Sequence, residues 1–179
     1  MLLLYKDREE MIEAFASYFS QGLKDQEMCM FSYDDEEIIK RLKSAMAKYV
    51  DVESFESEGQ IVFMEKDSIY FENNEFDQEK VYETLKERLS RRQILGPGIR
   101  SGGDISWLGD DLFSQFAEYE QGLTERFSND NLIIMCAYPL SQLSPEKMVF
   151  IMQAHPFVIE KNGELWVVKE SEQELADLG

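Results

Sequence analysis

The stretch "EMCMFSYDDEEIIKRLKSAMAKY", residues 27–49, decides the fold class. Its opening apolar run predicts a strand over about 27–33. Acidic residues follow at once, where they favour the start of a helix, and Ile38, Leu42 and Met46 then recur at helical spacing. A strand followed directly by an amphipathic helix is the repeating unit of α/β proteins.

The same alternation continues on both sides of this stretch. Further helices are expected over 7–23, 77–95, 110–127 and 144–155, and further strands over 59–65, 98–102 and 131–140. The run from 156 to 170 predicts two strands around "KNGE", because Asn-Gly favours a tight hairpin turn. We therefore expect an α/β fold: a three-layer, mostly parallel sheet with helices on both faces and a C-terminal β-hairpin.

Length and composition predict one soluble domain. The 179 residues are 44% hydrophobic, yet they contain no stretch of about 18 uncharged apolar residues, which a membrane helix requires. We expect a single domain over 1–170, followed by an acidic tail over 171–179. The opening "MLLLY" is too short for a signal peptide, so the sequence predicts a cytoplasmic protein.

The charge balance disfavours two classes of partner. The 36 acidic residues outnumber the 18 basic residues and give a formal net charge of −18. This charge repels the phosphates of nucleic acids and the surfaces of anionic membranes. We therefore expect no direct nucleic-acid binding and no membrane contact.

The sequence lacks the motifs of nucleotide chemistry. Neither GxxxxGK[ST] nor GxGxxG occurs, so no row of backbone amides is available to hold phosphates. We expect no ATPase activity, no catalytic residue and no cofactor. Cys29 and Cys136 lie inside apolar runs, which is typical of buried free thiols. One histidine, His155, cannot complete a tetrahedral Cys/His zinc site with them, so no metal site is expected.

Candidate ligand contacts come from the ends of the expected strands. Ligands of parallel α/β sheets bind beyond the carboxyl ends of the strands. The apolar opening run before Tyr5 is also expected to be a strand. Five residues close or follow an expected strand and have side chains suited to binding: Tyr5, Tyr33, Asp104, Trp107 and Tyr138.

Three charged or titratable groups have more than one interpretation. The acids at 34–37 could hold magnesium, but carboxylates at a helix start also stabilise the helix dipole without a metal. Arg100 lies in a strand expected to be buried, where a guanidinium needs an anionic partner. That partner is either an internal carboxylate, Asp104 or Glu120, or a ligand. His155 either caps the end of a helix or contacts a ligand.

Five stretches, taken in order, then identify a family. They are "FSQGLKDQEMCMF" at 19–31, "GIRSGGDISW" at 98–107, "EYEQGL" at 118–123, "MCAY" at 135–138 and "HP" at 155–156. Together they resemble the MEDS domain, the methanogen/methylotroph sensory domain. The resemblance extends from Tyr5 to about Val168.

The resemblance implies a fold and a role. The family is a derived branch of the RecA-like (P-loop NTPase-like), clock-protein-type ATPase fold, and its phosphate loop is here reduced to "MLLLYKDRE". Its members are proposed to sense small organic molecules, including hydrocarbon derivatives, and many are fused to kinase or DNA-binding domains. This chain departs from the family pattern twice. It lacks a histidine shortly before Tyr5, and it has Gly103-Asp104 where the family often has Gly-Glu.

Our leading hypothesis is a non-catalytic sensory or regulatory domain that binds a small organic ligand in the degenerate nucleotide crevice. In this hypothesis Arg100 and Asp104 orient the ligand, and His155 closes one side. Aromatic walls come from Tyr5, Tyr33, Trp107 and Tyr138. The alternative is a ligand-free interaction or homo-oligomerisation module that acts with a signalling kinase or a transcription regulator. A residual metal-dependent enzyme using Glu36 and Glu37 ranks third.

Overall fold

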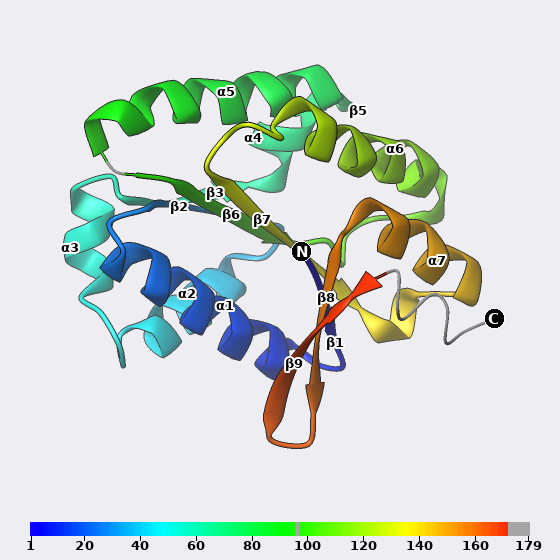
Figure 1. The fold of residues 1–179 in the computed structure, drawn as a ribbon, viewed down its shortest axis with the longest axis horizontal. Coiled ribbons are helices and arrows are strands. Elements are labelled where there is room, and N and C mark those ends of the chain that lie inside the picture. The colour runs from blue at the N-terminus through cyan, green and yellow to red at the C-terminus, as the bar shows by residue number, and fades with distance from the viewer. Residues whose placement is uncertain (96, 172–179) are drawn as a thin grey trace. The chain divides into compact units, whose positions relative to one another are not determined.

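The computed structural model describes residues 1–95 and 97–171, and within these it leaves out the side chains of 91–95 and 124. It shows an α/β fold with a mostly parallel seven-stranded sheet and an antiparallel C-terminal hairpin, as the sequence predicts (Figure 1). The expected acidic tail lies outside the described residues except for Ser171, and so does Gly96.

The elements follow the predicted alternation closely. The helices are α1 (Arg8–Lys24), α2 (Glu36–Met46), α3 (Val52–Ser57), α4 (Lys66–Tyr70), α5 (Gln78–Leu95), α6 (Asp110–Arg126) and α7 (Pro145–Ala154), with a 3-10 turn at Leu140–Gln142. The strands are β1 (Leu2–Tyr5), β2 (Met28–Tyr33), β3 (Ile61–Glu65), β4 (Phe71–Glu72), β5 (Glu75–Phe76), β6 (Ile99–Asp104), β7 (Leu132–Pro139), β8 (Phe157–Asn162) and β9 (Leu165–Glu170). The sequence did not predict α3, α4 or the small β4–β5 hairpin.

The chain divides into two compact units. The first unit comprises Met1–Met11, Asp104–Ser128 and the described residues from Met135 onward, and the second comprises Ile12–Gly103 and Asn129–Ile134. Both units combine segments that lie far apart in the sequence. The expectation of one domain over 1–170 stays a prediction.

In the second unit, three parallel strands are covered by helices on both sides. β2 lies between β3 and β6, and Phe31 pairs in register with Phe63 and Gly102. Figure 1 shows α5 on one side of these strands and α1 with α2 on the other. The rings of Phe15, Phe19 and Phe31 pack together with centroids 5.0 to 5.9 Å apart and form part of the core.

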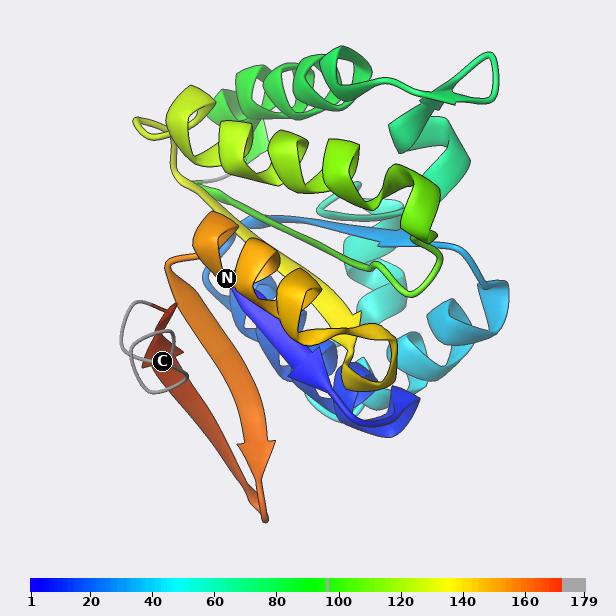
Figure 2. The ribbon, with the colours of Figure 1, turned by 90° about the vertical axis from the view of Figure 1, so that its right-hand side faces the viewer.

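The first unit is built around β1. This strand lies between β7 and β8, parallel to both, and its four residues are buried. β9 runs antiparallel to β8 and forms the outer edge of the unit (Figure 2). α7 begins as predicted, because Ser144 accepts a hydrogen bond from the backbone of Lys147 and Pro145 occupies the first turn. No helix in the described part of the chain is long and apolar enough to cross a membrane.

Candidate functional site

A buried polar cluster in the first unit draws on three elements. Cys136 and Tyr138 lie two residues apart on β7, so their side chains point to the same face of the strand. Glu120 belongs to the inward stripe of α6, four residues after Phe116. His155 follows the last turn of α7. We call these four residues the Glu120 cluster, and every member is at most 7% exposed.

The Glu120 carboxylate has one satisfied oxygen. Oε2 accepts a 2.8 Å hydrogen bond from the Tyr138 hydroxyl, whereas Oε1 is buried and has no hydrogen-bond partner among the described residues. Oε1 lies 3.8 Å from His155 Nε2, beyond hydrogen-bond distance. Burial raises the pKa of Glu120 to about 7, and the neighbouring Cys136 and Tyr138 oppose this increase.

The other two titratable members are held in their uncharged forms. His155 Nδ1 lies 2.7 Å from the carbonyl oxygen of Ile151, and burial lowers the pKa of His155 to about 3. Burial, with the Glu120 charge beside it, raises the pKa of Cys136 well above its ordinary range. Because a nucleophilic cysteine needs a lowered pKa, the structure supports the expectation that Cys136 is a buried thiol.

A second buried network lies at the carboxyl ends of β1 and β6. Asp104 is fully buried and accepts hydrogen bonds from the Tyr5 hydroxyl at 2.7 Å and from the Ser106 backbone and hydroxyl at 3.1 and 2.8 Å. Trp107 packs edge-on against Phe116 at 5.5 Å. Burial, reinforced by the Asp104 charge, raises the pKa of Tyr5 above its ordinary range. Three candidate ligand contacts, Tyr5, Asp104 and Trp107, thus lie in one part of the first unit.

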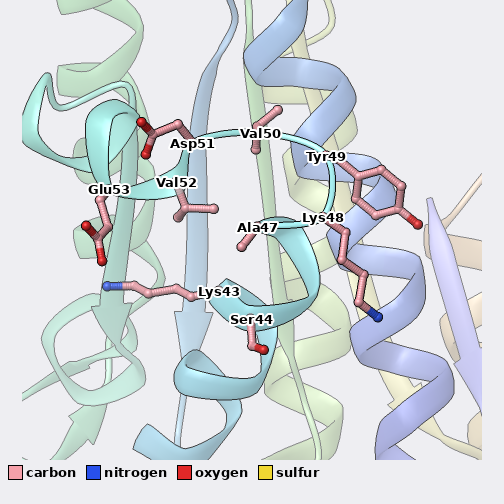
Figure 3. Close-up of a pocket in the computed structure, with 9 residues that line it drawn as sticks. All are labelled: Lys43, Ser44, Ala47, Lys48, Tyr49, Val50, Asp51, Val52 and Glu53. Atoms are coloured by element: carbon pink, nitrogen blue, oxygen red, sulfur yellow. The ribbon is translucent and has the colours of Figure 1, made fainter.

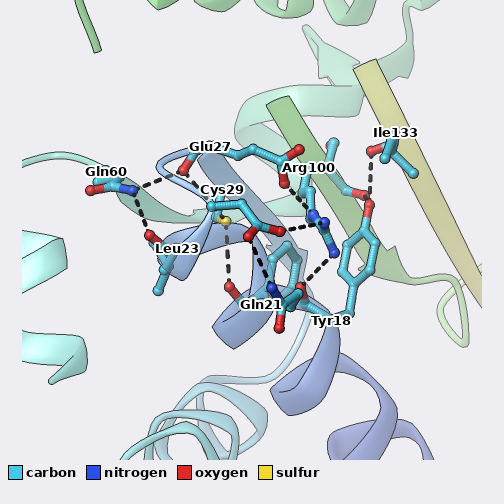
Figure 4. Close-up of polar contacts among 11 residues, drawn as sticks. Tyr18, Gln21, Leu23, Glu27, Cys29, Gln60, Arg100 and Ile133 are labelled. Atoms are coloured by element: carbon cyan, nitrogen blue, oxygen red, sulfur yellow. Dashed lines mark hydrogen bonds and ion pairs between the residues drawn. The ribbon is translucent and has the colours of Figure 1, made fainter. Parts of the chain in front are cut away.

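Arg100 lies in the second unit and has internal partners (Figure 4). Its Nε donates to Glu27, its NH1 donates to the Tyr18 carbonyl oxygen at 3.2 Å, and its NH2 lies 3.5 Å from Asp25. The guanidinium also stacks over the Tyr18 ring, 5.2 Å from the centroid. The internal pair that the sequence left open is present, but the carboxylates are Glu27 and Asp25 rather than Asp104 or Glu120.

The position of Arg100 in its strand also separates it from Asp104. Arg100 is the second residue of β6 and Asp104 is the last. Four residues of a strand span about 13 Å. The structure therefore does not bring these two residues together around one small ligand.

The Arg100 site joins two of the stretches that identified the family. Glu27 and Cys29 come from the first stretch, and Gly22 of that stretch lies under the Arg100 side chain, where a Cβ would meet Arg100 Cδ at 2.7 Å. Cys29 is buried, and burial raises its pKa to about 12 while the Arg100 charge opposes this. The other three stretches supply Glu120, Cys136, Tyr138 and His155. Sequence reasoning missed Glu120 as the centre of a cluster, although a carboxylate within an apolar helical stripe was a visible signal.

The acidic run after β2 caps a helix. Asp35 accepts a 2.9 Å hydrogen bond from the Glu37 backbone at the start of α2, and Asp34 pairs with Lys66 at 3.3 Å. These contacts favour the capping interpretation over a magnesium site. Tyr33 is half-buried at the end of β2.

An open hollow lies in the second unit. It has a volume of about 740 Å³ and is lined by residues 43, 44 and 47–53, at the end of α2 and the start of α3 (Figure 3). None of the seven candidate contacts lines it. Its lining mixes charged side chains with apolar ones: Lys43, Lys48, Asp51 and Glu53 alternate with Ala47, Tyr49, Val50 and Val52.

Comparisons with known proteins agree with this fold. Residues 1–156 match the model of the MEDS family, described as "MEthanogen/methylotroph, DcmR Sensory domain". The flagellar accessory protein FlaH from Methanocaldococcus jannaschii shares 11% identity at a TM-score of 0.53, over 94% of this chain and 75% of FlaH. EssC (ATPases 2 and 3) from Geobacillus thermodenitrificans shares 11% identity at a TM-score of 0.46, over 94% of this chain and 37% of EssC. No curated protein matches the sequence. The likeness to FlaH shows the fold alone, which is RecA-like.

Proposed function

Because the chain belongs to the MEDS family of sensory domains, we propose that it is a non-catalytic sensory domain that binds a small organic molecule. The observation that supports this proposal is the network of Tyr5, Asp104 and Ser106. It lies at the carboxyl ends of parallel strands, where α/β proteins bind their ligands. The half-buried Trp107 beside it offers an apolar wall.

The charges narrow the class of ligand. A fully buried carboxylate at the site, in a chain of net charge −18, disfavours a further anion. The sequence suggested Arg100 as the counter-charge for an anionic ligand. In the structure, Arg100 lies near the amino end of β6 and forms an ion pair with Glu27. We therefore expect an uncharged or cationic ligand, such as a halomethane, a thiol or a methylated amine, rather than a nucleotide.

Thermal unfolding in the presence of a ligand panel tests this proposal. A ligand at 100 times its Kd stabilises the folded state by about 2.7 kcal/mol. For a chain of this length, that corresponds to an increase in Tm of about 5–10 °C. The panel contains nucleotides, methylated amines, thiols and halomethanes. A flat response across the panel, or a response to nucleotides alone, contradicts the proposal.

Two tyrosine variants locate the binding site. Tyr5→Phe removes the hydroxyl that bonds Asp104 and should reduce the ligand-induced shift in Tm. Tyr18→Phe is the matched control, because its hydroxyl also donates within the protein, to the carbonyl oxygens of Ser101 and Ile133, but lies beside Arg100. Equal ligand responses of the two variants would place the site elsewhere.

A second candidate function is self-association through β9. This edge strand exposes Leu165 and Val168, which are 72% and 60% exposed, and its outer backbone edge could pair antiparallel with β9 of a second copy. In that case Leu165→Lys with Val168→Lys should convert a dimer to a monomer in light scattering. Tyr49→Lys, at an exposed hydrophobic residue outside β9, should not. A wild-type monomer at high concentration would exclude this function.

A further inference from the structure

Three side chains of the Glu120 cluster have the donor atoms of a metal site. Glu120, Cys136 and His155 each offer one ligand atom, and these three atoms all lie within 4.8 Å of one another. A tetrahedral ion with bonds of 2.0–2.3 Å holds its ligand atoms about 3.3–3.8 Å apart. Glu120 Oε1 and His155 Nε2 are already 3.8 Å apart, so movements of up to about 1.5 Å would complete the set.

The orientation of His155 suits a metal ligand. A carbonyl oxygen only accepts hydrogen bonds, so the 2.7 Å contact with Ile151 places the ring proton on Nδ1. The lone pair of the neutral ring is then on Nε2, the nitrogen that faces Glu120. A backbone carbonyl that fixes the tautomer in this way is the usual outer partner of a metal-bound histidine.

Glu120 is oriented in the same manner. The Tyr138 hydroxyl holds Oε2, while Oε1 points into the cluster without a hydrogen-bond partner among the described residues. A buried polar atom left in this state destabilises the folded protein. A bound ion is one of the few features that explain such an atom in a native protein.

We propose that Glu120, Cys136 and His155 bind one divalent cation of the zinc type. The donor set of nitrogen, sulfur and oxygen suits this borderline-soft ion, whereas magnesium and calcium prefer oxygen alone. The charges of a divalent ion, one thiolate, one carboxylate and one neutral imidazole sum to zero, and the buried Met1 α-amino group lies within electrostatic range of the same cluster. Three protein ligands leave a fourth position for water or a small donor molecule.

This proposal departs from the expectation of no metal site, which came from the reasoning about a Cys/His zinc site. That reasoning counted only cysteine and histidine, and it required both cysteines. The structure assigns the third ligand to a carboxylate on α6 instead. The metal site is independent of the organic ligand proposed above, since its test uses the metal alone.

The experiment titrates the chelator-treated full chain with Zn²⁺ against a chromogenic chelator, and separately with Co²⁺ as a spectroscopic substitute. We expect one equivalent to bind, and Co²⁺ to show a thiolate charge-transfer band with the visible bands of a four-coordinate ion. Cys136→Ser should abolish the band and weaken Zn²⁺ binding by at least about tenfold. Cys29→Ser is the matched control, because it also removes a buried thiol, and should behave as wild type.

A second variant guards against effects on folding. Glu120→Gln keeps the shape of the side chain and an oxygen that can accept from Tyr138, so the metal-free protein should unfold at or above the wild-type temperature. We expect it to bind Zn²⁺ at least about tenfold more weakly than wild type. Wild-type protein without a thiolate band, or Glu120→Gln with wild-type affinity for Zn²⁺, would overturn the proposal.

Discussion

Gly22 shows how a single residue position is fixed by its neighbour. It lies within α1, where alanine is favoured over glycine by about 1 kcal/mol. A Cβ here, however, would lie 2.7 Å from Arg100 Cδ and 3.1 Å from Cys29 Sγ. Because Glu27 holds the Arg100 side chain in place, the arginine cannot withdraw without losing its ion pair. The close approach of Arg100, rather than helix propensity, therefore explains the glycine at this position.

We predict that Gly22→Ala destabilises the protein by about 1–3 kcal/mol through overpacking. In an Arg100→Ala background the cost should fall, because the closest contacts of the new Cβ are removed and only the 3.1 Å approach to Cys29 Sγ still opposes the helix preference for alanine. Urea unfolding of the four proteins measures this coupling. Ser17→Ala, on the exposed face of the same helix, should be slightly stabilising in both backgrounds. Equal costs of Gly22→Ala in the two backgrounds would refute the contact.

Single residues also show what the sequence could and could not predict of the candidate site. Burial of Cys29 and Cys136 followed from their apolar neighbours, and capping by Asp35 followed from its place before a helix. The partners of Arg100 could not be predicted in this way. Glu27 lies 73 positions before Arg100 in the sequence, and only the pairing of β2 with β6 brings the two residues together. Contacts between distant segments leave no local pattern.

At the level of elements, the β4–β5 hairpin contains the clearest local conformational signal that the sequence reading overlooked. The turn of "FENNEF" consists of Asn73 and Asn74, with φ angles of 51° and 66°. Two residues at positive φ form the turn type that Asn-Gly favours, and asparagine is the residue other than glycine that tolerates this region best. The rule for Asn-Gly found the later hairpin but did not extend to Asn-Asn.

Asn74 gives a prediction for this hairpin. Asn74→Ala should cost about 1–2 kcal/mol, because alanine pays the full penalty of the left-handed region, whereas Asn74→Gly should match or exceed the wild-type stability. Asn162→Ala is the control, since Asn162 is exposed and ends β8 without a positive φ. Chemical denaturation compares the three variants. If both substitutions of Asn74 have the same effect, the turn does not have this conformation.

The length of a helix decided whether its hydrophobic periodicity could be recognised in the sequence. α1 and α6 each bury a stripe over 17 residues, so their periodicity was evident. α3 and α4 have six and five residues, too few for any period to appear. Asp51, which accepts a hydrogen bond from Ser54 at the start of α3, was the remaining local signal.

At the scale of the whole molecule, the alternation of elements bears on the fold, whereas the net charge bears on stability. The alternation of strands and helices predicted the mostly parallel sheet, and the fold proved RecA-like, as for FlaH. The division into two units could not be predicted, because each unit combines segments distant in sequence and no linker composition marks a boundary. The net charge says nothing of the fold, but it bears on stability.

The excess of acidic residues predicts a salt dependence of stability. With a net charge of −18, repulsion among surface carboxylates opposes the compact state. The exposed ion pairs do not offset this, since pairs such as Lys43–Glu56, with side chains 35% and 41% exposed, contribute at most about 1 kcal/mol each. Raising sodium chloride from about 0.01 to 0.15 M shortens the Debye length from about 30 to 8 Å and screens the repulsion. We expect Tm to rise by about 3–6 °C, a gain of one to two kcal/mol for a chain of this length.

Potassium chloride should raise Tm equally, whereas sulfate would add a stabilising effect through its exclusion from the protein surface. A Tm that falls with added chloride salts would mean that attraction between the charged side chains outweighs their repulsion.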